Sequence, residues 1–488
     1  MENVLVRDNK KQVTGGISSV VNFILSCLIK LPLLLFVILP LGLVAELFRT
    51  IISLPFSLGK KKTTKAKDPN KYTLPEVDVE KQIPLESRKY DLVLYGCTGF
   101  TGRLAASYLA KNYGNGDLKW AIAGRRAGRL EEIRKELAQE SQNDSLIDSV
   151  DIIVADSGKE DTLHDLVSNT RVVVSTVGPF LYYGTPVVKY CVAYGTSYAD
   201  TTGEVHWVRD TIEHFQEAAI RTGARIVSLC GNDCIPWDLL AKLLADKLKA
   251  ESNTDVKSFE FYNDLGGAAS GGTIATVISA LSVKAEKGSK GDPMNMLPSG
   301  ELSSNRVYMS KSSKIGYSKT SKKWHSSAFM ARVNHRCVQR SNALLGYGKK
   351  ISYFEVNNQA NWFTARQTSI DLLFLGCFIG IRSLRKLAYS LGAIPLPGQG
   401  PSKEVQESGY LRVHGFAKGE DGTVVDGYIY FPQDPGYCST ARMVVESGLC
   451  MVLQAEELPV KGGFWSPAAG LGNILKERLE KTGTEFQI

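Results

Sequence analysis

The chain has 488 residues, of which 43% are hydrophobic and 22% charged, and its formal net charge is +8. This balance excludes an intrinsically disordered chain, and the length is typical of two or three domains. The nine cysteines are irregularly spaced, and the isolated pair Cys230 and Cys234 has no nearby histidine. We therefore expect buried thiols and no metal site.

The first part of the chain, residues 1–58, predicts a membrane anchor. Segment 20–48 is apolar apart from two charged residues, but its unbroken apolar part, 31–45, is shorter than the roughly 20 residues that span a bilayer. A spanning helix would need Lys30 to reach the interface, whereas two prolines favour a kinked or hairpin insertion. The lysine-rich linker 59–88 then predicts a cytosolic body on an intracellular membrane, such as the endoplasmic reticulum or a lipid droplet.

From residue 89 onward, short apolar runs alternate with helical patterns. Strands are predicted at 90–96, 118–124, 150–156 and 170–178, and helices at 103–114 and 128–140. This alternation is typical of an α/β fold with a doubly wound parallel sheet of the Rossmann type.

The turn after the first predicted strand reads YGCTGFTG and has glycines at Gly96, Gly99 and Gly102. Glycines at this spacing allow a sharp bend, a close approach of the backbone to a phosphate, and tight packing of the next helix on the strand. Thr98 and Thr101 add hydroxyl groups to the same turn. We predict that the turn binds the pyrophosphate of a dinucleotide.

The end of the second predicted strand indicates which dinucleotide binds. Arg125 and Arg126 directly follow Gly124, and no carboxylate comes before Glu131. An acid here would accept a hydrogen bond from the ribose of NAD, whereas an arginine would bind the 2′-phosphate of NADP. We therefore predict NADP(H) as the cofactor, with Arg125 on its ribose phosphate.

Two later segments suggest contacts with a surface. Window 301–350 has eleven Lys/Arg against one acid, which fits a solvated loop, anionic lipid headgroups or an acidic substrate group. Nucleic acid fits less well, because aromatic residues are not interleaved with the lysines. Segment 370–396 is apolar and then basic and is too short to span a membrane, so an interfacial helix and a buried core helix are both open.

The chain resembles the saccharopine dehydrogenase-like oxidoreductase family in YGCTGFTGR, AIAGRR, GNDCIPWDLL and the long block 171–204. The resemblance covers about residue 88 to the end. It implies a Rossmann domain at 89–254 and a second α/β domain with a mixed sheet, for substrate binding and dimerisation, at 255–455. The C-terminal segment, 456–488, is expected to return to the Rossmann domain.

The same resemblance implies roles for individual residues. The phosphate turn would be formed by Gly96, Gly99, Phe100, Thr101 and Gly102. Around the cofactor, Arg125 would contact the ribose phosphate, Asp156 the adenine side, and Val177, Gly178 and Pro179 the nicotinamide half, while Asp200 and Glu204 would face the cleft. The chain departs from the family at Asn232 and Cys234, where members often carry an aromatic residue and a serine.

The catalytic candidates are Tyr183, Asp200 and Glu204. No tyrosine has a lysine four positions later, which argues against the proton relay of short-chain dehydrogenases. Tyr182 or Tyr183 could donate a proton beside the nicotinamide, with simple packing as the alternative. Asp200 and Glu204 could act as acid or base, although Glu204 could equally cap a helix. Asp233 is expected only to support the site.

We expect a membrane-associated, NADP-dependent oxidoreductase that acts on an apolar carbonyl or enoyl lipid-like substrate. The alternative is a non-catalytic structural or redox-sensing protein of a lipid surface that retains cofactor binding. The expected partners are a membrane or lipid-droplet surface, an acyl substrate and a second copy of the chain.

Overall fold

The structure is a computed structural model that describes residues 40, 71–78, 80, 82–266, 296–297, 305–310, 315–390 and 399–488. Within these ranges no helix combines the length and apolar character needed to cross a membrane. The predicted anchor lies outside the described residues except for Pro40, and so does linker segment 59–70. The membrane anchor therefore stays a prediction.

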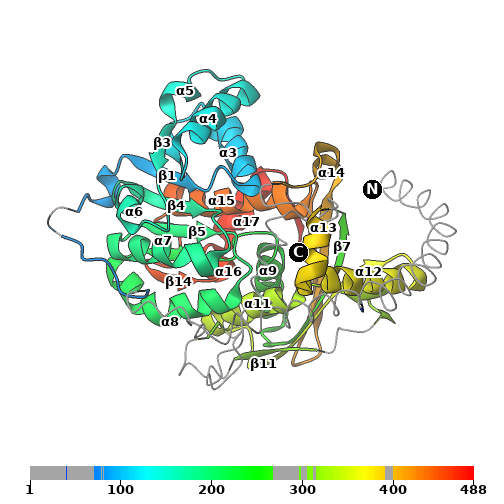
Figure 1. Cartoon of the computed structure of the whole chain (residues 1–488). Helices are drawn as coiled ribbons and strands as arrows, with labels where there is room; N and C mark the ends of the chain where they lie inside the picture. The colour runs from blue at the N-terminus through cyan, green and yellow to red at the C-terminus, as the bar shows by residue number, and fades with distance from the viewer. Residues whose placement is uncertain are drawn as a thin grey trace, which may run out of the picture.

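The first layer is a seven-stranded sheet in the order β14-β6-β5-β4-β1-β2-β3, with every neighbouring pair parallel (Figure 1). This order confirms the predicted Rossmann-type sheet. Its strands are β1 (Tyr90–Tyr95), β2 (Trp120–Gly124), β3 (Asp151–Val154), β4 (Thr170–Ser175), β5 (Ser197–Asp200), β6 (Arg225–Val227) and β14 (Gly463–Trp465).

Alternate side chains of β1 explain why helices cover both faces of this sheet. Leu92 and Leu94 point into one apolar cluster, while Val93 and Tyr95 point into another. The first cluster includes residues of α3 (Phe100–Tyr113), α4 (Ala127–Ser141) and α15 (Thr440–Leu453). The second includes residues of α6 (Leu163–Ser168), α7 (Phe180–Tyr194) and α8 (Val205–Thr222).

The second layer is an eight-stranded sheet in the order β15-β13-β12-β7-β11-β10-β9, with β8 also paired to β11. Strand β11 runs parallel to β7 and β8, whereas the other pairs are antiparallel, so the predicted mixed sheet is confirmed. Its strands are β7 (Val256–Gly266), β8 (Arg306–Met309), β9 (Gly316–Tyr317), β10 (Trp324–Ser327), β11 (Lys350–Gln359), β12 (Tyr410–Gly419), β13 (Val424–Phe431) and β15 (Glu485–Gln487).

Helix α9 (Ile235–Ser252) joins the two layers. Its Leu240 and Leu244 belong to the same apolar cluster as Phe261 and Val413 of the mixed sheet and Leu92 of the Rossmann sheet. The remaining helices are α5 (Leu146–Ser149), α11 (Ala331–Leu345), α12 (Trp362–Gly380), α13 (Arg382–Ser390), α14 (Lys403–Ser408), α16 (Pro467–Gly470) and α17 (Gly472–Lys481).

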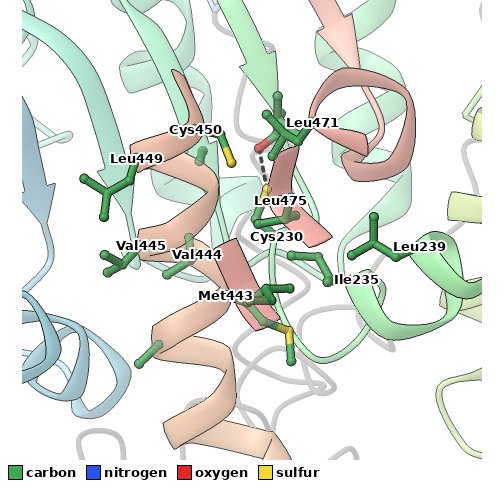
Figure 2. Close-up of a cluster of buried hydrophobic side chains, with 14 of the residues drawn as sticks. Cys230, Ile235, Leu239, Met443, Val444, Val445, Leu449, Cys450, Leu471 and Leu475 are labelled. Carbon is green, nitrogen blue, oxygen red and sulfur yellow. Dashed lines mark hydrogen bonds between the residues drawn. The ribbon is translucent and has the colours of Figure 1, made fainter. Parts of the chain in front are cut away.

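The last part of the chain contributes to both layers. Figure 2 shows Met443, Leu449 and Cys450 of α15 in one apolar cluster with Leu471 and Leu475 near the C-terminus. Helix α15 thus covers the Rossmann sheet, although it falls in the range expected for the second domain. The segment after residue 456 adds β14 to the Rossmann sheet and β15 to the mixed sheet.

Candidate functional site

The glycine turn between β1 and α3 is closely packed against the loop that follows β4. Gly96 has a φ of +105°, and a Cβ there would come within 2.7 Å of Thr176 Oγ1. A Cβ on Gly102 would meet the same hydroxyl at 2.6 Å. Gly99 is the N-cap of α3 and offers no side-chain cap, so the first N–H groups of the helix are available to a phosphate.

The three residues of the turn with larger side chains, Thr98, Phe100 and Thr101, have different surroundings. Thr98 is half-buried beside the end of β2, where a Cβ on Gly124 would lie 3.9 Å from its methyl group. Thr101 is half-buried in the first turn of α3. The ring of Phe100 packs edge-on against Tyr437, with 5.2 Å between the ring centroids. Phe100 therefore attaches the turn to a distant part of the chain.

The ends of β2 and β3 bring Arg125 and Asp156 toward one phenol. Burial raises the pKa of Tyr95, the charge of Asp156 raises it further, and the charge of Arg125 lowers it, so both charges lie near this ring. Arg125 and Arg126 are exposed and form no ion pair within the described ranges. Arg125 is therefore available for a ligand phosphate, and its predicted contact with the ribose phosphate stays a prediction.

The loop after β4 contains Val177, Gly178 and Pro179 and leads into α7. Glu204 fixes the start of that helix, because its two carboxylate oxygens accept hydrogen bonds from the backbone N–H groups of Phe180 (2.8 Å) and Leu181 (3.0 Å). The side chain is 1% exposed, and burial raises its pKa. This geometry favours an anchoring role for Glu204 over proton transfer to a substrate.

Asp200 is also committed to the backbone. Its carboxylate accepts hydrogen bonds from Thr202 N (3.0 Å), Leu229 N (3.2 Å) and Ser228 Oγ (3.0 Å). It is completely buried, and burial raises its pKa to about 7. Asp200 therefore ties the loops after β5 and β6 together, which again favours positioning over catalysis.

Tyr182 and Tyr183 lie in the first turn of α7, next to the nicotinamide-side loop. Their side chains are 60% and 39% exposed, and their rings contact each other edge-on at 6.4 Å. Tyr183 thus remains a candidate by position, but surrounding groups do not orient its hydroxyl in the described structure.

A second carboxylate pair was not singled out as catalytic from the sequence. Asp233 follows β6, is half-buried, and forms no hydrogen bond or ion pair within the described chain. Burial raises its pKa to about 6. Glu355, on β11, contributes to the same electrostatic environment, and burial raises its pKa to about 7. Asp233 belongs to the GNDC motif, whereas Glu355 lies inside a strand of mixed polar and apolar residues with no local signal.

Known proteins are similar to this chain over the Rossmann sheet and most of the remaining sequence. The sequence model of the saccharopine dehydrogenase NADP-binding domain matches residues 92–227. A Mycobacterium tuberculosis protein named "Putative trans-acting enoyl reductase" is 34% identical over 422 residues, covering 82% of this chain and 97% of its own. The chain belongs to the saccharopine dehydrogenase-like oxidoreductase family. It is an NAD(P)-dependent oxidoreductase, and the matched domain supports the predicted NADP(H).

Two further proteins are similar to this chain. The trans-acting enoyl reductase of Mycobacterium ulcerans is 31% identical over 424 residues and covers 81% of this chain and 97% of its own. The solved apo saccharopine dehydrogenase (L-Glu forming) of Saccharomyces cerevisiae has 14% identity and a TM-score of 0.46, covering 81% of this chain and 99% of that one.

Proposed function

We propose that this protein reduces the carbon–carbon double bond of an apolar enoyl substrate with NADPH. The observation that carries the proposal is the similarity, over nearly the whole length of the relatives, to proteins named as trans-acting enoyl reductases. Bound NADPH would supply the hydride. The described residues support the rest of the reaction by binding the cofactor, orienting it and holding a proton.

Each part of the carboxyl edge of the Rossmann sheet has a role in this proposal. The turn at Gly96–Gly102 would bind the pyrophosphate, and Arg125 would bind the 2′-phosphate. Val177 to Pro179 would lie against the nicotinamide, in a position that Glu204 stabilises by anchoring α7. The chain thereby fixes the face of the cofactor that meets the substrate.

The test is consumption of NADPH with a defined enoyl substrate. The purified full chain is mixed with NADPH and the N-acetylcysteamine thioester of trans-2-dodecenoic acid, with the saturated dodecanoyl thioester as the control. We expect one equivalent of NADPH to be oxidised for each saturated product detected by mass spectrometry. NADPH binding without consumption, across a series of enoyl chain lengths, would instead support the non-catalytic lipid-surface alternative.

We also propose that the protein works on an anionic membrane or lipid-droplet surface inside the cell. Support comes from the helical pair α12 and α13, where Leu373, Leu375 and Leu387 are 52%, 40% and 47% exposed. Arg382 and Lys386 are exposed on the same pair. Exposed leucines next to basic side chains are typical of a helix that lies in a membrane interface. Segment 391–396 of the predicted patch lies outside the described residues.

A further inference from the structure

The loop between β6 and α9 presents one carboxylate that the fold does not use. The carboxylates of Asp200, at the end of β5, and Glu204, at the start of α8, accept hydrogen bonds from backbone and hydroxyl donors. The Asp233 carboxylate has no hydrogen bond or ion pair within the described ranges, although it is half-buried. Ligands of Rossmann-type sheets bind at the carboxyl ends of the strands, so a half-buried carboxylate that the fold leaves unengaged at this edge points to a ligand.

The surroundings of Asp233 come from both layers of the fold. A Cβ on Gly203, in the loop after β5, would lie 3.6 Å from Asp233 Oδ2 and 3.6 Å from the terminal methyl group of Met330. Met330 is the N-cap residue of α11. The titratable groups whose charges interact with that of Asp233 include Cys234, on its own loop, and Glu355, on β11.

Glu355 organises the polar wall behind this point. It accepts hydrogen bonds from Tyr353 Oη (2.5 Å), Asn334 Nδ2 (3.0 Å) and Asn263 Nδ2 (3.3 Å) and is 1% exposed. Asn334 is fully buried, and its Oδ1 has no partner in the described structure. Glu355 therefore links the two residues: it accepts a hydrogen bond from buried Asn334, and its charge interacts with that of half-buried Asp233.

From this arrangement we infer that Asp233 is the catalytic acid that protonates the substrate, with Glu355 and Asn334 as positioning residues. The inference rests on the proposed enoyl reduction. The hydride forms a C–H bond at the β-carbon as the π bond breaks, and the electron pair moves to the α-carbon and its carbonyl. Asp233 then transfers its proton to the α-carbon and is left as a carboxylate, which solvent reprotonates. NADPH is oxidised to NADP⁺ and the acyl chain is reduced.

Burial supports this role in a second way. The pKa of Asp233 is raised to about 6, so a useful fraction of the carboxyl groups keeps the proton near neutral pH. A general acid of this kind typically contributes about 10²–10⁴-fold to the rate. Tyr182 and Tyr183 are exposed, so water competes for their hydroxyl groups.

The test compares Asp233→Asn, Asp233→Glu and the control Asp246→Asn in the full chain. Asp246 lies on the exposed surface of α9, paired with Lys242. With the dodecenoyl thioester, we expect Asp233→Asn to lower kcat by about 10²–10³-fold, with NADPH affinity within twofold of the wild type. Asp233→Glu should recover part of the rate, and Asp246→Asn should retain all of it.

The pH profile separates catalysis from a structural effect. In the wild type, kcat should fall as pH rises above about 6, because the acid loses its proton, and this limb should be absent in Asp233→Asn. The same fall of kcat should persist in Glu355→Gln, and its persistence would show that Glu355 is not the titrating group. A kcat within threefold of wild type in Asp233→Asn, an unchanged limb, or a loss confined to KM would overturn the inference. Absence of wild-type turnover would overturn the proposed function itself and this inference with it.

Discussion

At the scale of single residues, carboxylates on one edge of the sheet differ because their hydrogen-bond partners differ. Asp200 and Glu204 accept from backbone N–H groups and hold loops in place, whereas Asp233 has an open carboxylate. Backbone hydrogen bonds to a carboxylate stabilise its charged form and hold the side chain in place, which suits a residue that positions loops. The residue type alone therefore does not identify the catalytic group.

Arg125 provides a prediction about cofactor choice. Arg125→Ala removes the group proposed to bind the 2′-phosphate, so NADPH affinity should fall by about 10–100-fold, in line with the 1.5–3 kcal/mol of a charge-assisted hydrogen bond. NADH affinity should stay the same. Energy transfer from tryptophan to the bound dinucleotide measures the affinities for NADPH and for NADH. Arg129→Ala is the matched control, because Arg129 pairs with Glu132 and Glu136. Equal losses for NADPH and NADH would contradict the assignment.

At the scale of secondary-structure elements, helices α9 and α12 show two opposite uses of apolar residues. Helix α9 buries its leucines between the two sheets. Helix α12 leaves Leu373 and Leu375 exposed and shares only a small apolar cluster with α13, around Ile379 and Ala388. Exposed apolar side chains on α12 favour contact of this helix with a partner surface.

The proposed membrane contact of α12 is tested with Leu373→Glu and Leu375→Glu, which replace exposed apolar side chains by negative charges. The chain without residues 1–58 should still sediment with vesicles that contain phosphatidylserine, and the pair should weaken this binding by about 10-fold or more, since each exposed leucine contributes on the order of 1 kcal/mol. Leu453→Glu, at an exposed leucine of α15, is the control and should bind normally. Complete release of the shortened wild-type chain would limit membrane binding to the N-terminal segment.

At the scale of the whole molecule, buried acids connect elements that are far apart in the sequence. Asp238 of α9 accepts hydrogen bonds from Ser341 of α11 and from the backbone N–H of Ala468, and burial raises its pKa to about 6. Glu355 connects β7, α11 and β11 in the same way. The predicted homodimer, which no contact between copies tests, stays a prediction.

The raised pKa of Glu355 predicts how stability depends on pH. The folded pKa is about 7 and the ordinary value 4.5, so the folded state binds the proton more tightly than the unfolded state. Glu355 therefore contributes about 3 kcal/mol to the free energy of unfolding below about pH 4.5. This contribution is lost as the pH rises through about 7. Denaturant unfolding at several pH values should show this decline in the wild type and in Glu132→Gln. Glu355→Gln should flatten it; an unchanged slope would contradict the prediction.

The sequence by itself determined the Rossmann sheet, the glycine turn that follows its first strand, and the cofactor. These features depend on local signals, namely the alternation of apolar runs, the spacing of Gly96, Gly99 and Gly102, and an arginine directly after β2. The tertiary structure alone decided which carboxylates are engaged and which is open. Glu355 and Asn263 are 92 positions apart, and Asp238 reaches a backbone N–H 230 positions away. Burial and hydrogen-bond partners of this kind arise from long-range packing, which no local pattern contains.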